Sequence, residues 1–322
     1  MRRTIAVTLV AVAVLAAGCA NPSSESESVT LRYSLDDGDT FTYRNEYDMA
    51  MTTEIEGLPM EDVPDGPIDI DLSAALTTRY AVSDGTEPGT YAVTFGYDEV
   101  SDLAMTMRAG GEEMTFTEDD LAGELAGSGV PLPGNEVEFI VDSSGHILSV
   151  NVDGTPVPLP GVAGGGLSGF GSETPFLGPE MPEGPVAVGD TWTAEWSVEP
   201  FPGTEMQVSA QSHLLSVETV DGAEVYVIET TTTATPLDVE LADILGGLAA
   251  EDLAGGPADF GLTMRVAATP GRSTVWFDPA RGITVRQEFA GGADVTMSFQ
   301  GEGQSGSMTM RTTMEGSLRL VP

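Results

Sequence analysis

The sequence has no lysine, one cysteine and two histidines among its 322 residues, and each shortage excludes a class of function. Without lysine the chain has no amine for Schiff-base chemistry and no Ser-Lys nucleophile pair. The single cysteine, Cys19, excludes an intramolecular disulfide, so the fold must depend on its core alone. Neither His146 nor His213 has a second ligand at metal-binding spacing, so we expect no zinc site.

Basic residues are also scarce. All 12 are arginines, and they face 51 acidic residues, which gives a formal net charge of −39. Phosphate backbones need clustered positive charge, so the composition excludes a nucleic-acid partner. It also argues against direct docking of the folded body onto anionic lipid heads. Acidic turns such as Asp36–Asp39 do not have calcium-loop spacing, because the twelfth position is Tyr47, although weak divalent-cation binding there remains open.

Motifs for catalysis and cofactors are missing as well. There is no Walker loop and no dinucleotide fingerprint, and Gly166–Phe170 fails the nucleophile-elbow pattern at its last position. We therefore expect no cofactor and no catalytic residue. A Ser-His-Asp triad stays open as the weakest hypothesis, because its members meet only in space.

The first nineteen residues have the layout of a secretory signal. Arg2 and Arg3 precede a short apolar run, Ile5–Val14, and Leu15–Cys19 then supplies small residues that end on the cysteine. The run is short for a membrane span, although an uncleaved anchor is the alternative interpretation. The segment resembles bacterial lipoprotein signals, in which the cysteine is acylated, for example with palmitate, and becomes the first mature residue.

This resemblance implies a mature chain that begins at Cys19 and is anchored by lipid to the cell membrane, outside the cytoplasm. Residues 1–18 would be the signal peptide and 19–28 the lipidated cysteine with a flexible tether. Loss of Arg2 and Arg3 would bring the formal charge to −41. Acylation also accounts for a lone cysteine in an oxidising compartment.

Alternation with a period of two dominates the rest of the chain and indicates half-buried strands. Phe41, Tyr43, Tyr47, Met49 and Met51 alternate with polar residues, and similar runs recur to the C-terminus. The fold class we expect is mainly β, a large curved antiparallel sheet, half-barrel-like, with one or two short helices packed on it.

Short matching segments predict two related halves in tandem. Gly38–Thr42 matches Gly189–Thr193, and late hairpins after Phe139 and Val275 follow in the same order. We therefore divide the mature chain into a β-rich half 29–154, a connector 155–184 rich in Gly and Pro, and a second β-rich half 185–322. The alternative is that antiparallel sheets repeat turn chemistry without duplication.

Each half contains one helix signal. Thr117–Asp120 is a capping-box-like start before Leu121. Thr235–Asp238 combines an N-cap with a proline at the first helical position, and Leu237 and Leu241 continue at helical spacing. Both helices are predicted to pack on the sheet.

Two resemblances bear on function. Gly189–Trp192, Val141–Gly145 and Phe277–Gly282 resemble motifs of an uncharacterised family of secreted bacterial lipoproteins of actinobacterial type. The expected architecture is similar to the half-barrel lipoprotein carriers of the LolA/LolB and LppX/LprG families. That similarity implies acyl chains held between sheet and helices, but it transfers no binding residue.

The expected function is therefore a non-catalytic envelope lipoprotein that binds or carries a hydrophobic, lipid-like ligand. Methionines concentrate on the predicted inner face, and flexible methionine suits adaptable apolar surfaces. They either fill a core or line a ligand site. The candidate ligand-binding residues are Met49, Met51, Met105, Met107, Leu121, Leu241, Met264 and Met297. The alternative is a structural or interaction lipoprotein with a filled core, whose acidic face binds cations, glycans or protein partners.

Overall fold

The computed structural model describes residues 28–57, 66–117, 120, 137–152, 155–157, 178–198, 204–240, 261–301 and 304–321. The signal segment, Cys19, most of the tether, Leu121 and Leu241 lie outside the described residues. Within them there are fourteen strands, and Asp120 is the single residue in a helical conformation. None of the described residues belongs to a helix with the length and hydropathy needed to span a bilayer.

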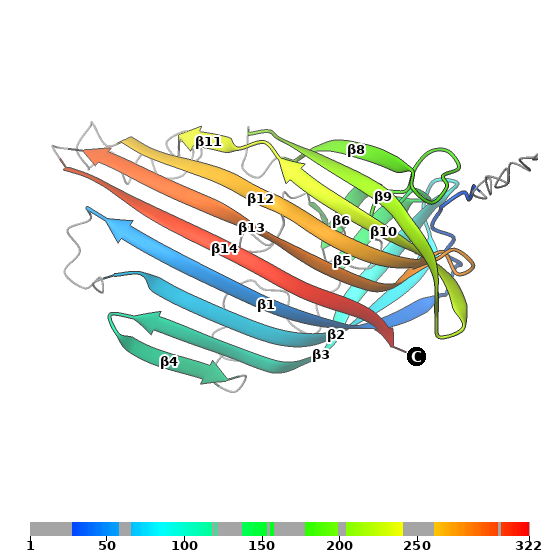
Figure 1. Cartoon of the computed structure of the whole chain (residues 1–322), viewed down its shortest axis with the longest axis horizontal. Coiled ribbons are helices and arrows are strands. Elements are labelled where there is room, and N and C mark those ends of the chain that lie inside the picture. Colours follow the sequence, from blue (N-terminus) through cyan, green and yellow to red (C-terminus); the bar gives the residue numbers. More distant parts are fainter. Residues whose placement is uncertain are drawn as a thin grey trace, which may run out of the picture.

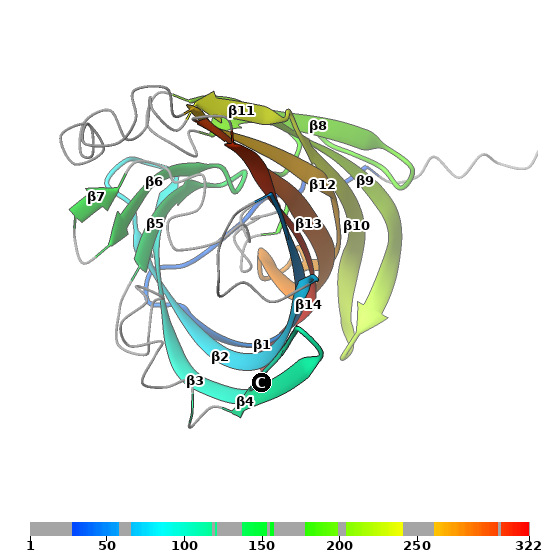
Figure 2. The same cartoon turned by 90° about the vertical axis from the view of Figure 1, so that its left-hand side faces the viewer.

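The strands are β1 (Thr40–Glu56), β2 (Ile68–Asp84), β3 (Thr90–Ala109), β4 (Glu112–Thr117), β5 (Val137–Asp142), β6 (Ile147–Val152), β7 (Thr155–Val157), β8 (Thr191–Val198), β9 (Met206–Val220), β10 (Ala223–Ala234), β11 (Leu237–Glu240), β12 (Gly261–Asp278), β13 (Ile283–Gly301) and β14 (Gln304–Val321). They form one open antiparallel sheet in the order β7-β6-β5-β3-β2-β1-β14-β13-β12-β10-β9-β8, with β4 beside β3 and β11 beside β12 (Figure 1). The sheet curves strongly around its inner face (Figure 2), so the predicted mainly β, antiparallel class is confirmed.

The first and last strands join the two predicted halves. β1 pairs with β14 from Thr42↔Val321 to Glu56↔Ser307, so both halves belong to one sheet. Strands β6-β5-β3-β2-β1 on one side of this seam follow the same order as β13-β12-β10-β9-β8 on the other. A tandem duplication predicts this repeated order.

Period-2 alternation sorts the side chains onto two faces. On β1, Phe41 and Tyr43 are buried and face inward, whereas Arg44, Glu46 and Asp48 are exposed on the outer face. Residues directly opposite one another on neighbouring strands share a face, so the strand register extends this assignment across the sheet. We call each such set of opposed residues a row.

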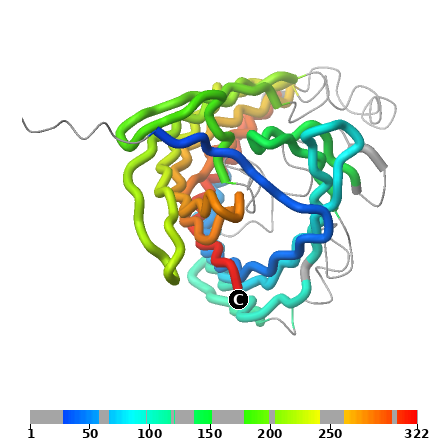
Figure 3. Tube along the Cα trace, turned by 90° about the vertical axis from the view of Figure 1, so that its right-hand side faces the viewer, coloured from blue at the N-terminus to red at the C-terminus, as the bar shows by residue number. Residues whose placement is uncertain are grey.

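One end of the sheet is covered on its inner face by the segment 28–39, which crosses it before entering β1 (Figure 3). Leu31 and Tyr33 are almost completely buried against strand residues of both halves, including Val141 and Phe277. The ring of Tyr33 meets that of Phe277 edge-on at 5.4 Å, and the backbone bridge Val29↔Val186 ties the segment to the start of the second half. We call this covered region the capped end.

The predicted helix from Thr235 is wrong where the structure describes it, because Leu237–Glu240 form strand β11. Leu237 and Val239 are buried and lie opposite Val266 and Met264 of β12. The intervening Asp238 points outward and binds the Arg265 guanidinium through both carboxylate oxygens, at 3.0 and 2.9 Å. Leu237 and Val239 are two residues apart, so both can pack on the same face when the segment pairs with the edge of β12. This tertiary packing outweighs the helical spacing between Leu237 and Leu241.

The other predicted helix start is partly visible. The carboxylate of Asp120 accepts hydrogen bonds from the backbone N–H and the hydroxyl of Thr117, both at 2.9 Å. The N–H contact is one half of a capping box, and it lowers the pKa of Asp120. The helix expected beyond Leu121 lies outside the described residues.

Candidate functional site

The candidate site is the inner face of the sheet beyond the capped end. Register places Met49 opposite Leu72, which in turn lies opposite Met105. In the next row Met51 lies opposite Ile70, and Ile70 opposite Met107. Four of the candidate methionines therefore form one continuous surface across β1, β2 and β3.

The other two described candidates lie on the same face in the second half. Met264 of β12 is directly opposite Met297 of β13, and Met297 is opposite Met308 of β14. This row continues to Ile55 of β1. It lies four residues further along β1 than Met51, about 13 Å at the usual rise of a strand. Six of the eight candidates predicted from the sequence therefore lie on one face of the sheet. The other two, Leu121 and Leu241, lie outside the described residues.

Packing differs along this face. Side chains at the capped end, such as Tyr43 and Phe277, are fully buried. Met49, Met51, Met105 and Met107 are only half-buried, as is Met297, although Met264 is buried in a small cluster with Val266 and Val295. Much of the methionine surface therefore retains contact with solvent, where uncovered apolar area costs about 25 cal/mol per Å².

The inner face beyond the capped end is uncharged on the central strands. On β1, β2, β12, β13 and β14, among the described residues, register assigns charged side chains to the inner face only at the capped ends of two strands, Asp84 of β2 and Asp278 of β12. The outer face of the same strands carries Arg44, Glu46, Asp48, Glu288 and Arg319. The two faces of one sheet are thus chemically opposite, and the inner face suits an apolar occupant.

A belt of buried polar side chains separates the capped end from the methionine surface, and sequence reasoning missed it. Its members lie on six strands in three neighbouring rows, and each is at most 9% exposed. They are Thr78 in the row of Tyr43, Asn45 and Gln287 on either side of Leu318 in the next row, and Ser273, Thr230 and Ser212 in the row after that. Asn45 donates from its amide nitrogen to the Thr78 hydroxyl at 2.8 Å, and the Ser212 and Thr230 hydroxyls lie 2.9 Å apart. The amide oxygen of Asn45 is buried and has no hydrogen-bond partner among the described residues. In the sequence, the only sign of this belt is a polar residue at a strand position whose alternation places it on the inner face.

An aromatic pair continues the row of Ser273, which is the row of the polar belt nearest the methionines. The rings of Tyr47 and Phe289 are 5.7 Å apart, and they stand on either side of Gly316, which lies opposite both residues. A Cβ atom on Gly316 would come within 2.5 Å of the Phe289 ring. The glycine therefore leaves the space that the ring of Phe289 occupies.

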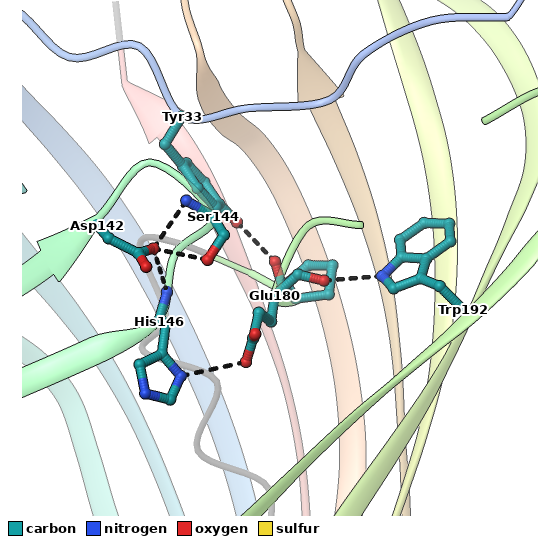
Figure 4. A network of polar contacts seen from close by, with 7 residues as sticks. Tyr33, Asp142, Ser144, His146, Glu180 and Trp192 are labelled. Carbon is teal, nitrogen blue, oxygen red and sulfur yellow. Dashed lines mark hydrogen bonds and ion pairs between the residues drawn. The ribbon is translucent and has the colours of Figure 1, made fainter. Parts of the chain in front are cut away.

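The polar network at the capped end does not form a catalytic triad (Figure 4). The Ser144 hydroxyl donates to Asp142 at 2.6 Å, and the His146 imidazole contacts Glu180 at 3.3 Å instead of a serine. Burial acts to raise the pKa of Asp142, but hydrogen bonds from Ser144 and from the His146 N–H outweigh it, so the pKa is lowered. This network stabilises a turn beneath Tyr33, where Gly145 has φ +88° and leaves no room for a Cβ.

The second histidine is equally unsuited to that role. Ser212 faces inward and is bonded to Thr230, whereas His213 lies opposite Thr191 and Glu229 on the other face. No group of three or more His, Cys, Asp or Glu side chains among the described residues could hold a metal ion.

The outer face carries a charged groove of about 480 Å³ over the seam between β1 and β14. Its charged lining residues are Glu46, Asp48, Glu229, Glu288, Glu315, Arg272 and Arg319. Neither Arg272 nor Arg319 has an ion pair with any residue that the structure describes. The groove is a polar surface feature, chemically unlike the inner face.

No protein-family model matches the chain, and no curated protein matches it. Among solved structures, the crystal structure of Pseudomonas aeruginosa OpdQ is similar at 9% sequence identity, covering 88% of this chain and 98% of that chain, with a TM-score of 0.22. A likeness of this strength carries no argument about fold or function.

Proposed function

We propose that this protein is a lipid-anchored protein of the cell envelope whose inner sheet face binds a hydrophobic, lipid-like ligand without catalysing a reaction. The observation that carries the proposal is the uncharged, methionine-rich inner face, which is only half-buried beyond the capped end. The anchor is proposed from the lipobox-like segment that ends at Cys19.

The chemistry of the face supports an apolar ligand of variable shape. Methionine has three rotatable bonds and a polarisable sulfur, so a surface of methionines can adapt to flexible chains. A ligand that covers the half-buried rows would remove apolar area from water, which is the main favourable term in such binding. The absence of charge on this face of the described central strands beyond the capped end means that nothing there opposes burial of a hydrocarbon.

A pair of neighbouring substitutions tests the site. In full-length protein with Cys19→Ser, we compare Met51→Glu, on the inner face, with Ala50→Glu, the adjacent exposed position on the outer face. The inner-face variant should lose about tenfold or more in affinity for the fluorescent apolar probe N-phenyl-1-naphthylamine, because a carboxylate there would be desolvated. The outer-face variant adds the same charge and should bind as the parent does.

Ligand recovery completes the test. Organic extracts of the purified parent protein, analysed by mass spectrometry, should contain a co-purifying lipid. Circular dichroism melts of both variants establish that they fold. Absence of both probe binding and extractable lipid from the parent protein would refute the proposal, as would equal loss in the two variants.

The outer groove favours a second candidate, a surface-interaction protein. Carboxylates line this groove of about 480 Å³, together with Arg272 and Arg319, which have no ion pair among the described residues. Such a mixture of charges suits glycans or a charged protein partner. Glu315→Gln with Arg272→Gln would weaken such an interaction while leaving apolar-probe binding unchanged, which separates this function from the first.

A further inference from the structure

We propose that the ligand is an uncharged amphiphile whose head group donates a hydrogen bond to Asn45 in the polar belt, while its hydrocarbon chain lies along the methionine rows. This inference rests on the proposed function and specifies its ligand class. It follows from the order of three zones on the inner face, which are the capped end, the polar belt and the methionine surface.

Asn45 supplies the first argument. Its side chain is 1% exposed, and its neighbours in the row are Leu76 and Leu318. The amide nitrogen donates to Thr78, but no residue in the described part of the chain donates a hydrogen bond to the amide oxygen. A buried acceptor without a donor is costly, and leucine would fill the same space without that cost. A ligand that brings a hydroxyl or an amide N–H would satisfy this oxygen.

The composition of the belt supplies the second argument. It contains only hydroxyl and amide side chains, and no arginine or carboxylate occupies an inner-face position on the described parts of β1, β13 and β14 beside Asn45 and Gln287. A phosphate or carboxylate head group would therefore lose its water without gaining a counter-charge, which strongly disfavours binding. A neutral, hydroxylated head group needs no counter-charge.

The geometry of the face supplies the third argument. The belt adjoins the capped end, where Tyr33, Tyr43 and Phe277 fill the space. The inner face beyond it runs from Tyr47 to Ile55 on β1, and the eight steps between these residues span roughly 26 Å. It is lined there by Met49, Met51, Met308, Met310 and Met314. One direction along the strands is closed, and the other offers an apolar path long enough for an extended acyl chain.

Three probes that share an eighteen-carbon hydrocarbon chain test the head group in the full-length Cys19→Ser protein: monooleoylglycerol, oleate and octadecene. Displacement of N-phenyl-1-naphthylamine at about pH 8, where the oleate head is ionised, gives each affinity. Monooleoylglycerol should bind about tenfold more tightly than either of the others. Asn45→Leu should abolish most of that preference and leave octadecene unchanged.

Two further variants serve as a control and as a second test of the belt. Thr53→Val changes an inner-face hydroxyl outside the belt and should keep the preference. Gln287→Leu alters the belt on the other side of Leu318 and should reduce the preference even if Asn45→Leu does not fold. Oleate binding as tightly as monooleoylglycerol, or Asn45→Leu and Gln287→Leu both keeping the full preference, would overturn the inference. Failure of all three probes to bind the parent protein would instead refute the proposed function.

Discussion

The hydroxyl of Tyr43 donates a hydrogen bond to the backbone carbonyl of Thr284 at 2.7 Å. Tyr43 lies on β1 and Thr284 on β13, so the bond passes across β14 and links the two halves of the chain beside their seam. Both residues are fully buried. Removing this bond therefore tests how much the stability of the folded chain depends on contacts between the two halves.

Tyr43→Phe should lower the free energy of unfolding by about 1–3 kcal/mol, because the Thr284 carbonyl would lose this donor in a buried site. Urea denaturation measures the loss. Tyr91→Phe is a suitable control, because its hydroxyl makes only a long contact of 3.4 Å with the Tyr33 carbonyl in a partly exposed site. Equal stability of the two variants would contradict the expectation.

The same residue predicts a response to alkaline pH. Burial, with a smaller contribution from Tyr80, raises the pKa of Tyr43 well above its ordinary value. The folded state thus holds the proton more tightly than the unfolded state, so the contribution is complete below about pH 10 and is lost as the pH rises further. Parent protein should lose stability above that pH more steeply than Tyr43→Phe, and parallel curves would exclude this origin.

Asp142 predicts a response to acid. Its lowered pKa means that its contribution to stability is present above about pH 4 and is lost as the pH falls through the folded-state value. At neutral pH, Asp142→Ala should cost about 1–3 kcal/mol, because Ser144 and the His146 N–H lose their acceptor. The difference from the parent should shrink in acid. Asp37→Ala, at an exposed turn position, should differ little from the parent at any pH.

Two glycines offer a matched test of the aromatic pair. Gly316→Ala should destabilise by about 1–3 kcal/mol, because the new Cβ would meet Phe289 at 2.5 Å and the Glu46 carbonyl at 2.6 Å. Gly291→Ala meets only the Gly271 Cα at 3.7 Å, so thermal melts should show a much smaller change. If both substitutions were tolerated equally, the ring of Phe289 would not lie where the structure places it.

Arginines occupy adjacent outer positions across the seam. Arg319 lies directly opposite Arg44 on one side and Arg286 on the other, and like charges in such pairs repel. Arg319→Gln should therefore be more stable than Arg79→Gln by up to about 1 kcal/mol at low ionic strength, because Arg79 pairs with Asp98 at 3.2 Å. The two variants change net charge equally, and added salt should reduce their difference.

Alternation in the sequence was sufficient to predict the long strands and the inward face of the six described candidate methionines, because a period of two survives in any half-buried strand. The pairing of β1 with β14 could not be predicted from it, because no local pattern encodes which distant edges meet. Leu237–Glu240 was assigned to a helix because capping signals are local, whereas the edge of β12 that it extends is not.

The candidate site was predicted in its apolar part only. Asn45 and Gln287 interrupt inward-facing apolar runs, and in a single sequence such positions are indistinguishable from ordinary irregularity. Only register shows that the polar residues on six strands lie in neighbouring rows, with Asn45 and Gln287 on either side of Leu318 and with Ser273, Thr230 and Ser212 in the next row. Likewise, Leu31 and Tyr33 precede the first strand, and their burial depends on contacts with residues more than a hundred positions away.

The segment that caps the sheet is also the one that leads from Cys19. Ser28 is nine residues after that cysteine, so an acylated Cys19 would hold the capped end within about 30 Å of the bilayer. Strand β1 has 17 residues and spans roughly 56 Å. An anchored molecule would therefore have a membrane-proximal closed pole and a distal apolar pole, and ligand transfer at the distal pole would involve an acceptor or donor beyond its own bilayer.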